Sequence, residues 1–480
     1  MEKILNYIDG ELVAPSTNKY IDNYNPSTGK VYSLIPDSDE EDVNRAVIAA
    51  NNAFPAWSTM RKEDRAGWLL KLANLLEQRL DEFVVAESMD NGKPFWLSRV
   101  VDIPRSISNL RFFATGIQHF PSEAHSMEDK AINYTLRDPV GVVGCISPWN
   151  LPLYLFTWKI APALAAGCCV VSKPSEITPM TAYMLSQLCV EIGFPKGVFN
   201  IVHGYGHSVG NAIVSHPEIK AISFTGGTKT GREIARIAAP MFKKLSLELG
   251  GKNPVLIFSD CNWDKMMRTT LDSSFSNQGE ICLCGSRILV EKSIYEDFRD
   301  EFVEKTKALH VGPPMEDISK LGAIVSQAHY EKILSYIDLA KHEGGKILCG
   351  GNALKMNGEF KDGWYIEPTV IEGLPQNCRT NMEEIFGPVV TIMPFETEDE
   401  AIEYANATEY GLTSMLWTEN LTRAHKLSAR LRSGIVWVNC WLLRDLRTPF
   451  GGMKNSGVGR EGGWEALRFF TEPKNVCIKL

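Results

Sequence analysis

The stretch Val140-Gly141-Val142-Val143-Gly144-Cys145-Ile146 decides the fold, together with the segments that follow it. It is a short apolar run of strand length. A segment of helix length follows over 151–165, and a second apolar run over 168–172. Short continuous apolar strands separated by helices indicate βαβ units and a parallel sheet covered on both faces. This stretch therefore predicts an α/β fold.

The alternation continues toward the C-terminus. Strands are expected at 198–202, 221–224 and 245–249, with helices at 178–191, 207–215 and 229–240. A second set places strands at 255–258, 288–290, 389–393 and 435–438, with helices at 262–277, 294–308, 327–343 and 397–406. Two α/β layers, each with its own sheet, are the economical interpretation.

The segments outside these two sets are of other kinds. Apolar residues at helical spacing predict helices over 40–120, with a stop at Asn91-Gly92 and a further helix at 105–118. The glycine- and lysine-containing stretch 352–366 is predicted to be a surface loop.

Size, charge and cysteine usage bound the class of protein. A chain of 480 residues predicts two or three domains. A net charge of −8 disfavours nucleic-acid binding. The longest apolar region, 151–171, contains Lys159 and two prolines, which favours buried elements over a membrane span. Eleven cysteines without a C-x-x-C pair or a signal peptide predict reduced thiols and a cytoplasmic protein, and no metal-ligand spacing is present.

A cysteine in a glycine-flanked loop is the first candidate for chemistry. Cys282 lies in Asn277-Gln278-Gly279-Glu280-Ile281-Cys282-Leu283-Cys284-Gly285, between an expected helix and a strand. Catalytic groups commonly sit on such loops, and the two glycines permit a tight backbone around the thiol. A small core residue is the alternative for a cysteine between Ile and Leu.

A carboxylate in an apolar strand is the second candidate. Glu248 lies in Leu245-Ser246-Leu247-Glu248-Leu249-Gly250-Gly251-Lys252. In an apolar environment it needs a partner or a raised pKa. A carboxyl group poised to take a proton from water is one solution. A structural pair with a Lys or Arg is the alternative.

Two further motifs follow strands. In Pro148-Trp149-Asn150 the Asn150 amide could donate to a developing oxyanion, or Asn150 could cap a helix. In Lys173-Pro174-Ser175-Glu176 the lysine and glutamate could hold ribose hydroxyls. A carboxylate there would repel a 2′-phosphate and favour NAD over NADP. A solvated loop is the alternative. Phe224–Gly231 follows a strand and opens a helix, so its N–H groups could approach a pyrophosphate.

Seven segments, present together and in order, resemble the aldehyde dehydrogenase superfamily from about residue 8 to the end. The glutamate and cysteine motifs stand 34 residues apart. The segments are Pro148–Asn150, Lys173–Glu176, Phe224–Gly226, Leu247–Lys252, the Cys282 loop, Glu383-Glu384-Ile385-Phe386-Gly387-Pro388 and Pro449-Phe450-Gly451-Gly452.

The resemblance implies two parallel-sheet Rossmann-like domains, one NAD-binding and one catalytic, and a small β-hairpin oligomerisation element. The implied boundaries are 1–119 and 140–247 for the NAD-binding domain with 449–467 packing back on it, 248–448 for the catalytic domain, and 120–139 with 468–480 for the oligomerisation element. A homodimer or homotetramer is the implied assembly.

The resemblance also implies residue roles. Cys282 would be the nucleophile, the Asn150 amide and the Cys282 N–H would stabilise the oxyanion, and Glu248 would activate water. A free thiol has a pKa near ~8.5, so we expect the site to favour the thiolate. Glu384 would hold the nicotinamide ribose. The positions that match coenzyme contacts are Trp149, Lys173, Ser175, Glu176, Thr225, Gly226, Gly231, Glu384 and Phe386.

Two positions depart from the family pattern. The family often has Gln where Glu280 stands and Ser where Gly227 stands. The first difference would add a negative charge beside the nucleophile. The second would remove a hydroxyl near the pyrophosphate. Neither removes a catalytic group.

The segments Asp102–Ser106 and Asn439–Asp445 look like the subgroup that oxidises 2-aminomuconic and 2-hydroxymuconic semialdehydes. Such substrates carry a carboxylate, which arginine recognises best. The resemblance places Arg105 and Arg444 in the substrate tunnel, with Phe450 also binding substrate. Surface arginines paired with Asp102 and Asp445 are the alternative.

Three rival functions remain at this point. One is an aldehyde dehydrogenase for aliphatic, aromatic or betaine aldehydes. Another is a phosphorylating or CoA-acylating dehydrogenase, which needs no water-activating base and so would not need Glu248. The last is a catalytically dead NAD-binding or structural paralogue, which should have lost Cys282, Glu248 or Asn150; all three are present.

Overall fold

The alternation that begins at residue 140 forms the larger of two sheets in the computed structural model, which describes residues 1–480. Five parallel strands stand in the order β12-β11-β8-β9-β10, and antiparallel strands extend both edges. The parallel strands are β8 (Val142–Ile146), β9 (Cys169–Lys173), β10 (Phe199–Ile201), β11 (Ile219–Thr225) and β12 (Lys244–Glu248); the edge strands are β2 (Asn6–Ile8), β3 (Glu11–Val13) and β24 (Gly457–Val458).

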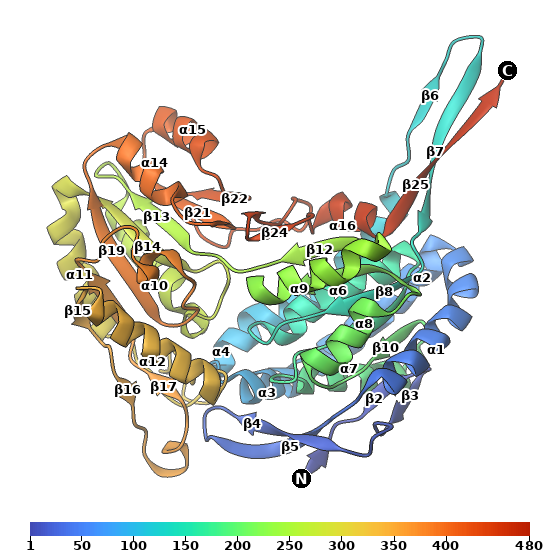
Figure 1. The fold of residues 1–480 in the computed structure, drawn as a ribbon, viewed down its shortest axis with the longest axis horizontal. Helices are drawn as coiled ribbons and strands as arrows, with labels where there is room; N and C mark the ends of the chain where they lie inside the picture. The colour runs from blue at the N-terminus through green and yellow to red at the C-terminus, as the bar shows by residue number, and fades with distance from the viewer.

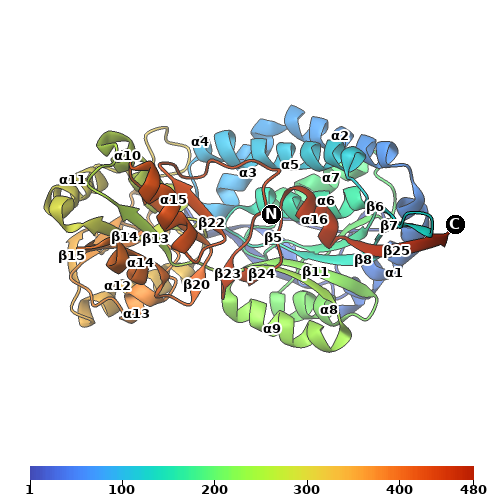
Figure 2. The ribbon, with the colours of Figure 1, turned by 90° about the horizontal axis from the view of Figure 1, so that it is seen from above.

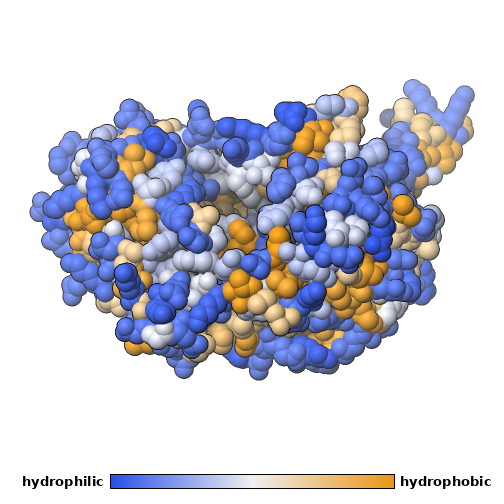
Figure 3. Space-filling model, turned by 60° about the horizontal axis from the view of Figure 1, so that its bottom comes forward, coloured by the Kyte–Doolittle hydropathy of each residue, from blue (hydrophilic) through white to orange (hydrophobic).

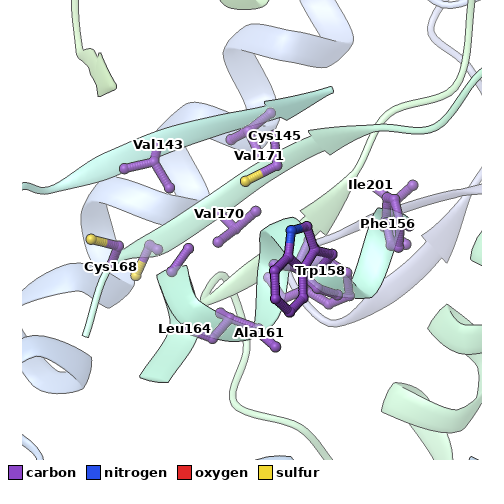
Figure 4. Close-up of a cluster of buried hydrophobic side chains, with 14 of the residues drawn as sticks. Val143, Cys145, Phe156, Trp158, Ala161, Leu164, Cys168, Val170, Val171 and Ile201 are labelled. Carbon is purple, nitrogen blue, oxygen red and sulfur yellow. The ribbon is translucent and has the colours of Figure 1, made fainter. Parts of the chain in front are cut away.

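Helix α6 explains the long apolar run. It spans Pro152–Ala166, and every one of its residues is buried. Figure 4 shows Trp158, Ala161 and Leu164 near the apolar side chains of β8 and β9. Gly167, with φ of 101°, ends the helix in the left-handed conformation. No helix of the chain has both the length and the apolar character required to cross a bilayer.

The other helices of this lobe follow the predicted periodicity. Asn91 ends α3 as predicted, because Gly92 adopts a φ of 89° that favours glycine. The predicted helix at 207–215 begins as a π-helical turn over Gly206–Gly210. The helices are α1 (Glu40–Thr59), α2 (Lys62–Gln78), α3 (Leu80–Asn91), α4 (Phe95–Leu97), α5 (Ile103–Gly116), α7 (Met180–Glu191), α8 (Asn211–Ser215), α9 (Thr228–Ala238) and α16 (Gly463–Phe469), with a second π-helical turn at Ser98–Asp102.

The second sheet lies in the other lobe, beside the first (Figure 1, Figure 2). Its order is β15-β18-β19-β14-β13-β21-β22, and only β15 is antiparallel to its neighbour. Its strands are β13 (Asn253–Ile257), β14 (Gly285–Glu291), β15 (Lys346–Cys349), β18 (Thr369–Glu372), β19 (Val389–Phe395), β21 (Thr413–Trp417) and β22 (Ile435–Val438). Its helices are α10 (Trp263–Phe275), α11 (Tyr295–Lys307), α12 (Gln327–His342), α13 (Arg379–Met382), α14 (Glu398–Asn406) and α15 (Leu421–Arg430).

The predicted surface loop over 352–366 is wrong at both ends. Strands β16 (Ala353–Leu354) and β17 (Tyr365–Ile366) pair with each other, and Tyr365 and Ile366 are buried. The Tyr365 hydroxyl donates to the Ser27 carbonyl at 3.2 Å. A long-range contact therefore fixes the end of a segment whose composition is typical of a loop.

A narrow arm extends beyond the first lobe (Figure 1). Strand β7 (Ala131–Pro139) pairs with β6 (Ala124–Ser126) and, along its whole length, with the C-terminal β25 (Thr471–Lys479). Figure 3 shows hydrophobic residues among hydrophilic ones on the arm, and Ile132, Leu136 and Ile478 are exposed. The domain boundaries and an assembly role for this arm stay predictions. The remaining small strands are β1 (Glu2–Lys3), β4 (Tyr20–Asn25), β5 (Lys30–Pro36), β20 (Tyr410–Gly411) and β23 (Met453–Lys454).

Candidate active site

Cys282 lies where two cavities meet. One has a volume of about 390 Å³ and the other about 270 Å³, and both are lined by Cys282, Thr225 and Leu249. The Cys282 residue is half-buried, so part of it is accessible. This placement does not fit the alternative of a packed core cysteine. It lets the thiol meet one molecule from each side.

The loop before Cys282 has an unusual backbone. Asn277 and Gln278 have φ values of 51° and 56°, and Gly279 has 72°. A side chain at position 279 would approach the Gly387 carbonyl oxygen to 2.2 Å, so glycine is required there. The Gln278 amide donates to Ala323 O at 3.2 Å and accepts from Gly322 N at 3.1 Å. Such a conformation persists only where its surroundings fix it, as they do here.

Asn150 lines the smaller cavity together with Cys282. Its Nδ2 donates to the Glu280 carbonyl at 3.0 Å, which uses one of its two N–H groups. Its own carbonyl accepts from Lys93 Nζ at 3.3 Å and from Asn277 Nδ2 at 3.0 Å. Helix α6 has Leu151 at its N-cap without a side-chain capping bond, so Asn150 is not a cap.

Glu248 ends β12 and lines the larger cavity. It is buried, and neither of its carboxyl oxygens has a hydrogen-bond partner. Burial raises the pKa of Glu248 well above its usual range, and nearby Glu461 adds to the shift. Glu461 accepts from Lys159 Nζ at 2.8 Å, while Glu248 makes no ion pair. The structural-pair alternative for Glu248 therefore does not hold.

The electrostatics around Cys282 disfavour a resting thiolate. Burial raises the pKa of the Cys282 thiol, and the carboxyl groups of Glu384 and Glu248 raise it further. The Arg444 guanidinium opposes this shift. In the ligand-free protein these contributions favour the neutral thiol, so they do not support the expectation of a resting thiolate.

The smaller cavity gathers five of the predicted coenzyme residues. They are Trp149, Thr225, Gly226, Glu384 and Phe386. The Glu384 carboxyl accepts from Gly251 N at 2.7 Å, and the Trp149 and Phe386 rings lie edge to face at 5.3 Å.

Four other predicted coenzyme residues do not line this cavity. Lys173 and Glu176 form an ion pair of 2.8 Å after β9, and Gly206 N donates to Glu176 at 3.3 Å. Ser175 Oγ accepts from Ile177 N at 3.2 Å. A side chain at Gly231 would approach Leu249 to 2.5 Å, so this glycine lets α9 pack closely.

Glu280 is fully buried directly before the turn at residues 281–284, which carries Cys282. Its carboxyl accepts from Val325 N at 3.2 Å. Burial raises the pKa of Glu280 well above its ordinary value, which favours the uncharged acid. The predicted negative charge beside Cys282 is therefore disfavoured.

The two candidate substrate arginines lie differently. Arg444 lines the larger cavity, donates to Tyr154 Oη at 2.9 Å and lies 4.0 Å from the centre of the Phe450 ring. Arg105 does not line that cavity. It lies in an open depression of about 690 Å³ that Arg444 also lines.

Neither arginine makes the ion pair that the alternative required. Asp102 is buried and pairs with Lys93 at 2.5 Å. Asp445 pairs with Arg447 at 2.6 Å. Arg444 thus faces the cavity without a carboxylate partner.

Asn253, Glu461 and Lys159 are among the residues around the site that were not predicted from the sequence. Asn253 Nδ2 donates to the carbonyls of Cys282 and Cys284, at 2.7 and 2.8 Å. Glu461 and Lys159 form the buried pair next to Glu248. Lys159 could have been found, because a lysine in an apolar helix needs a partner. Asn253 gave no comparable signal.

Comparisons with known proteins agree with this geometry. The model of the aldehyde dehydrogenase family matches residues 12–476. The chain is 51% identical over 477 residues to 2-aminomuconic semialdehyde dehydrogenase of Danio rerio, which covers 99% of this chain and 98% of the relative. It is 43% identical over 486 residues to 2-hydroxymuconic semialdehyde dehydrogenase of Pseudomonas sp. (strain CF600), covering both chains fully.

A solved structure agrees as well. The NAD+ complex of aldehyde dehydrogenase from Bacillus cereus superposes with a TM-score of 0.97 at 38% identity, covering 100% of this chain and 97% of the other. Similarity of this extent in sequence and in structure shows the family. The chain belongs to the aldehyde dehydrogenase family.

Proposed function

We propose that this protein oxidises an aldehyde to a carboxylate, with NAD as the hydride acceptor and a thioester on Cys282. The observation that carries the proposal is the position of Cys282 at the junction of two cavities. An aldehyde would enter through the larger cavity and the nicotinamide ring through the smaller one. The reaction requires a thiol that lies next to both the aldehyde and the nicotinamide ring.

The residues present fit NAD. Trp149, Glu384 and Phe386 line the smaller cavity and would hold the nicotinamide ribose and ring. Glu176, paired with Lys173, is suited to adenosine ribose hydroxyls and would repel a 2′-phosphate. The N-terminus of α9 begins directly after Gly226-Gly227 and would approach the pyrophosphate. When bound, NAD supplies the hydride acceptor.

The protein's own groups would act in two stages. The Cys282 thiol first loses its proton to solvent water, and the thiolate sulfur then attacks the carbonyl carbon. The resulting oxyanion accepts hydrogen bonds from the Asn150 amide and the Cys282 N–H. That N–H makes no hydrogen bond within the protein and is free to do so. After hydride loss gives the thioester, Glu248 takes a proton from water, which attacks the acyl carbon and releases the carboxylate.

A carboxylated semialdehyde of the 2-aminomuconic or 2-hydroxymuconic type is the substrate class that we propose. Arg444 faces the larger cavity without a carboxylate partner, in walls that are otherwise largely apolar. The two curated relatives described above carry these substrates in their names. Arg105 would assist from the mouth of the cavity, because it shares the outer depression with Arg444.

A panel assay tests the proposal. NADH formation would be measured with muconic-type semialdehydes and with aliphatic, aromatic and betaine aldehydes, each with NAD and NADP. We expect activity with NAD that is highest on the carboxylated substrates. Cys282→Ala should abolish it, while Cys284→Ala serves as the matched control. Full activity in Cys282→Ala, or an acyl-CoA or acyl-phosphate product, would refute the proposal.

We also propose a homodimer or homotetramer assembled through the β6–β7–β25 arm. The arm exposes Ile132, Leu136 and Ile478 on strands that extend away from the first lobe. Light scattering after size exclusion tests the assembly, and a monomeric wild-type protein would contradict it.

A further inference from the structure

Two side chains hold three consecutive carbonyls of the turn at residues 281–284, which we call the nucleophile turn because it carries Cys282. Asn253, at the start of β13, donates both N–H groups of its amide, to Cys282 O at 2.7 Å and to Cys284 O at 2.8 Å. Its Oδ1 accepts from Thr413 N at 3.1 Å, at the start of β21. The network fixes the orientation of this amide, because the opposite one would set its oxygen against two carbonyls.

Trp441 holds the third carbonyl. Its indole N–H donates to Leu283 O at 3.0 Å, and its ring lines the larger cavity. Trp441 precedes Leu442, whose φ of 55° is unusual for a branched side chain. The carbonyls of residues 282, 283 and 284 are therefore all occupied by side chains from outside the turn.

Within the turn, the N–H groups of Cys282 and Leu283 make no hydrogen bond. Cys284 N donates to Ile281 O at 2.9 Å. In a trans peptide the C=O and the N–H point in opposite directions, so the Cys282 N–H points away from the interior of the turn. It makes no hydrogen bond in the protein. The turn thus presents the thiol and this N–H while its carbonyls are tied back.

We propose that Asn253 and Trp441 are positioning residues, which hold this turn so that the Cys282 N–H can stabilise the oxyanion during acylation. The inference rests on the proposed function, because it takes Cys282 as the nucleophile. Asn253 acts through the carbonyl of the thiol residue itself and the carbonyl of Cys284, and Trp441 acts through the carbonyl of Leu283. Asn253 is buried, and all the bonds of its amide are to this turn and to β21.

The test compares Asn253→Ala and Trp441→Phe with the wild-type enzyme. Pre-steady-state NADH bursts with saturating NAD and a neutral aldehyde would report the rate constant of acylation. Iodoacetamide labelling of Cys282, read by mass spectrometry, would report the fraction of accessible thiol. Misplacing an oxyanion donor costs roughly 10²-fold, so we expect the burst rate constant to fall ~100-fold in Asn253→Ala and ~10-fold in Trp441→Phe, with labelling stoichiometry unchanged.

Trp57→Phe is the matched control. It removes an indole bond of the same kind, Trp57 Nε1 to Leu164 O at 3.2 Å, in the core of the first lobe. It should lower the melting temperature and leave the burst rate constant unchanged. Trp441→Phe keeps an aromatic ring in place, so it tests the inference even if Asn253→Ala folds poorly.

Two results would overturn the inference. One is a burst rate constant within twofold of wild type in Trp441→Phe. The other is a loss of burst amplitude that parallels the loss of labelled Cys282, which would indicate partial unfolding instead of mispositioning. An active Cys282→Ala would refute the proposed function itself, so the two failures are distinguishable.

Discussion

The two cavities that meet at Cys282 differ in how they are built. The smaller one is lined by several polar side chains, including Asn150, Glu384 and His329. The family resemblance predicted most of its candidate groups. The larger one is mainly apolar, and Arg444 is its one guanidinium. The coenzyme-contact residues expected from the family thus gather in the smaller cavity, which we propose takes the nicotinamide. The identity of the aldehyde depends on a few side chains in the larger cavity.

The largest effect should come from Glu248, the proposed base, which lines the larger cavity. Glu248→Gln keeps the size of the side chain and removes its ability to accept a proton from water. General base catalysis contributes typically ~10²–10⁴-fold, so kcat should fall by about that factor. The first-turnover NADH burst should persist, because the proposed acylation step does not use Glu248. A burst lost in parallel with kcat would assign Glu248 to the first stage.

The next largest effect should come from Arg444, which lines only the larger of these two cavities. Arg444→Ala should raise KM about 10- to 100-fold for a carboxylated semialdehyde, since a hydrogen bond to a charged group contributes ~1.5–3 kcal/mol. A neutral aldehyde should change little. Arg444→Lys keeps the charge and loses the bidentate geometry, so it should recover only part of the loss.

Replacing Arg105 should have a smaller effect on KM than replacing Arg444. Arg105 lies outside the cavity that contains Cys282, so Arg105→Ala should raise KM less than Arg444→Ala does. Equal losses on carboxylated and neutral aldehydes would contradict carboxylate recognition by both arginines.

Features that depend on neighbouring residues in the sequence could be predicted, whereas features that depend on contacts between distant residues could not. Apolar runs predicted β8 and α6, because their pattern is local. Strand β21 was not predicted, since its Thr413 and Ser414 are buried polar residues in a short segment. The catalytic candidates were found through motifs. Asn253 and Trp441 were not found, because their contacts with the nucleophile turn are distant in sequence. Asn253 lies 29 residues from Cys282, and Trp441 lies 158 residues from Leu283.

Both the acylation step at Cys282 and the deacylation step at Glu248 should become faster as pH rises. Burial and neighbouring acids raise the pKa of Cys282 and of Glu248, so each is neutral at low pH and gains its reactive anion only as pH increases. We expect kcat to increase from pH 6 to pH 9. The burst rate constant reports Cys282, and steady-state turnover reports Glu248 when deacylation limits. Rates that fall over this range would contradict the assignment.

The smallest effect concerns stability. The pKa of Glu280 is raised in the folded protein, so the folded state binds its proton more tightly than the unfolded state does. Its contribution is fully present below the unfolded pKa and is lost as pH rises through the folded pKa. Glu280→Gln removes this loss, and its Tm should exceed that of wild type by ~1–4 °C at pH 9, with a smaller gain at pH 5.

Differential scanning fluorimetry across that pH range measures this effect. Activity should change little in Glu280→Gln, because the uncharged acid and the amide are similar in shape. A Tm gain that is the same at pH 5 and pH 9 would show that Glu280 does not titrate as its burial implies.

The most direct test of the account is the intact mass of Glu248→Gln after one turnover with NAD and a carboxylated semialdehyde. The account predicts an acyl adduct of substrate mass minus one hydride and one proton, located on Cys282 by peptide mapping and released by hydroxylamine. An enzyme that forms NADH in this turnover while Cys282 stays unmodified would contradict it.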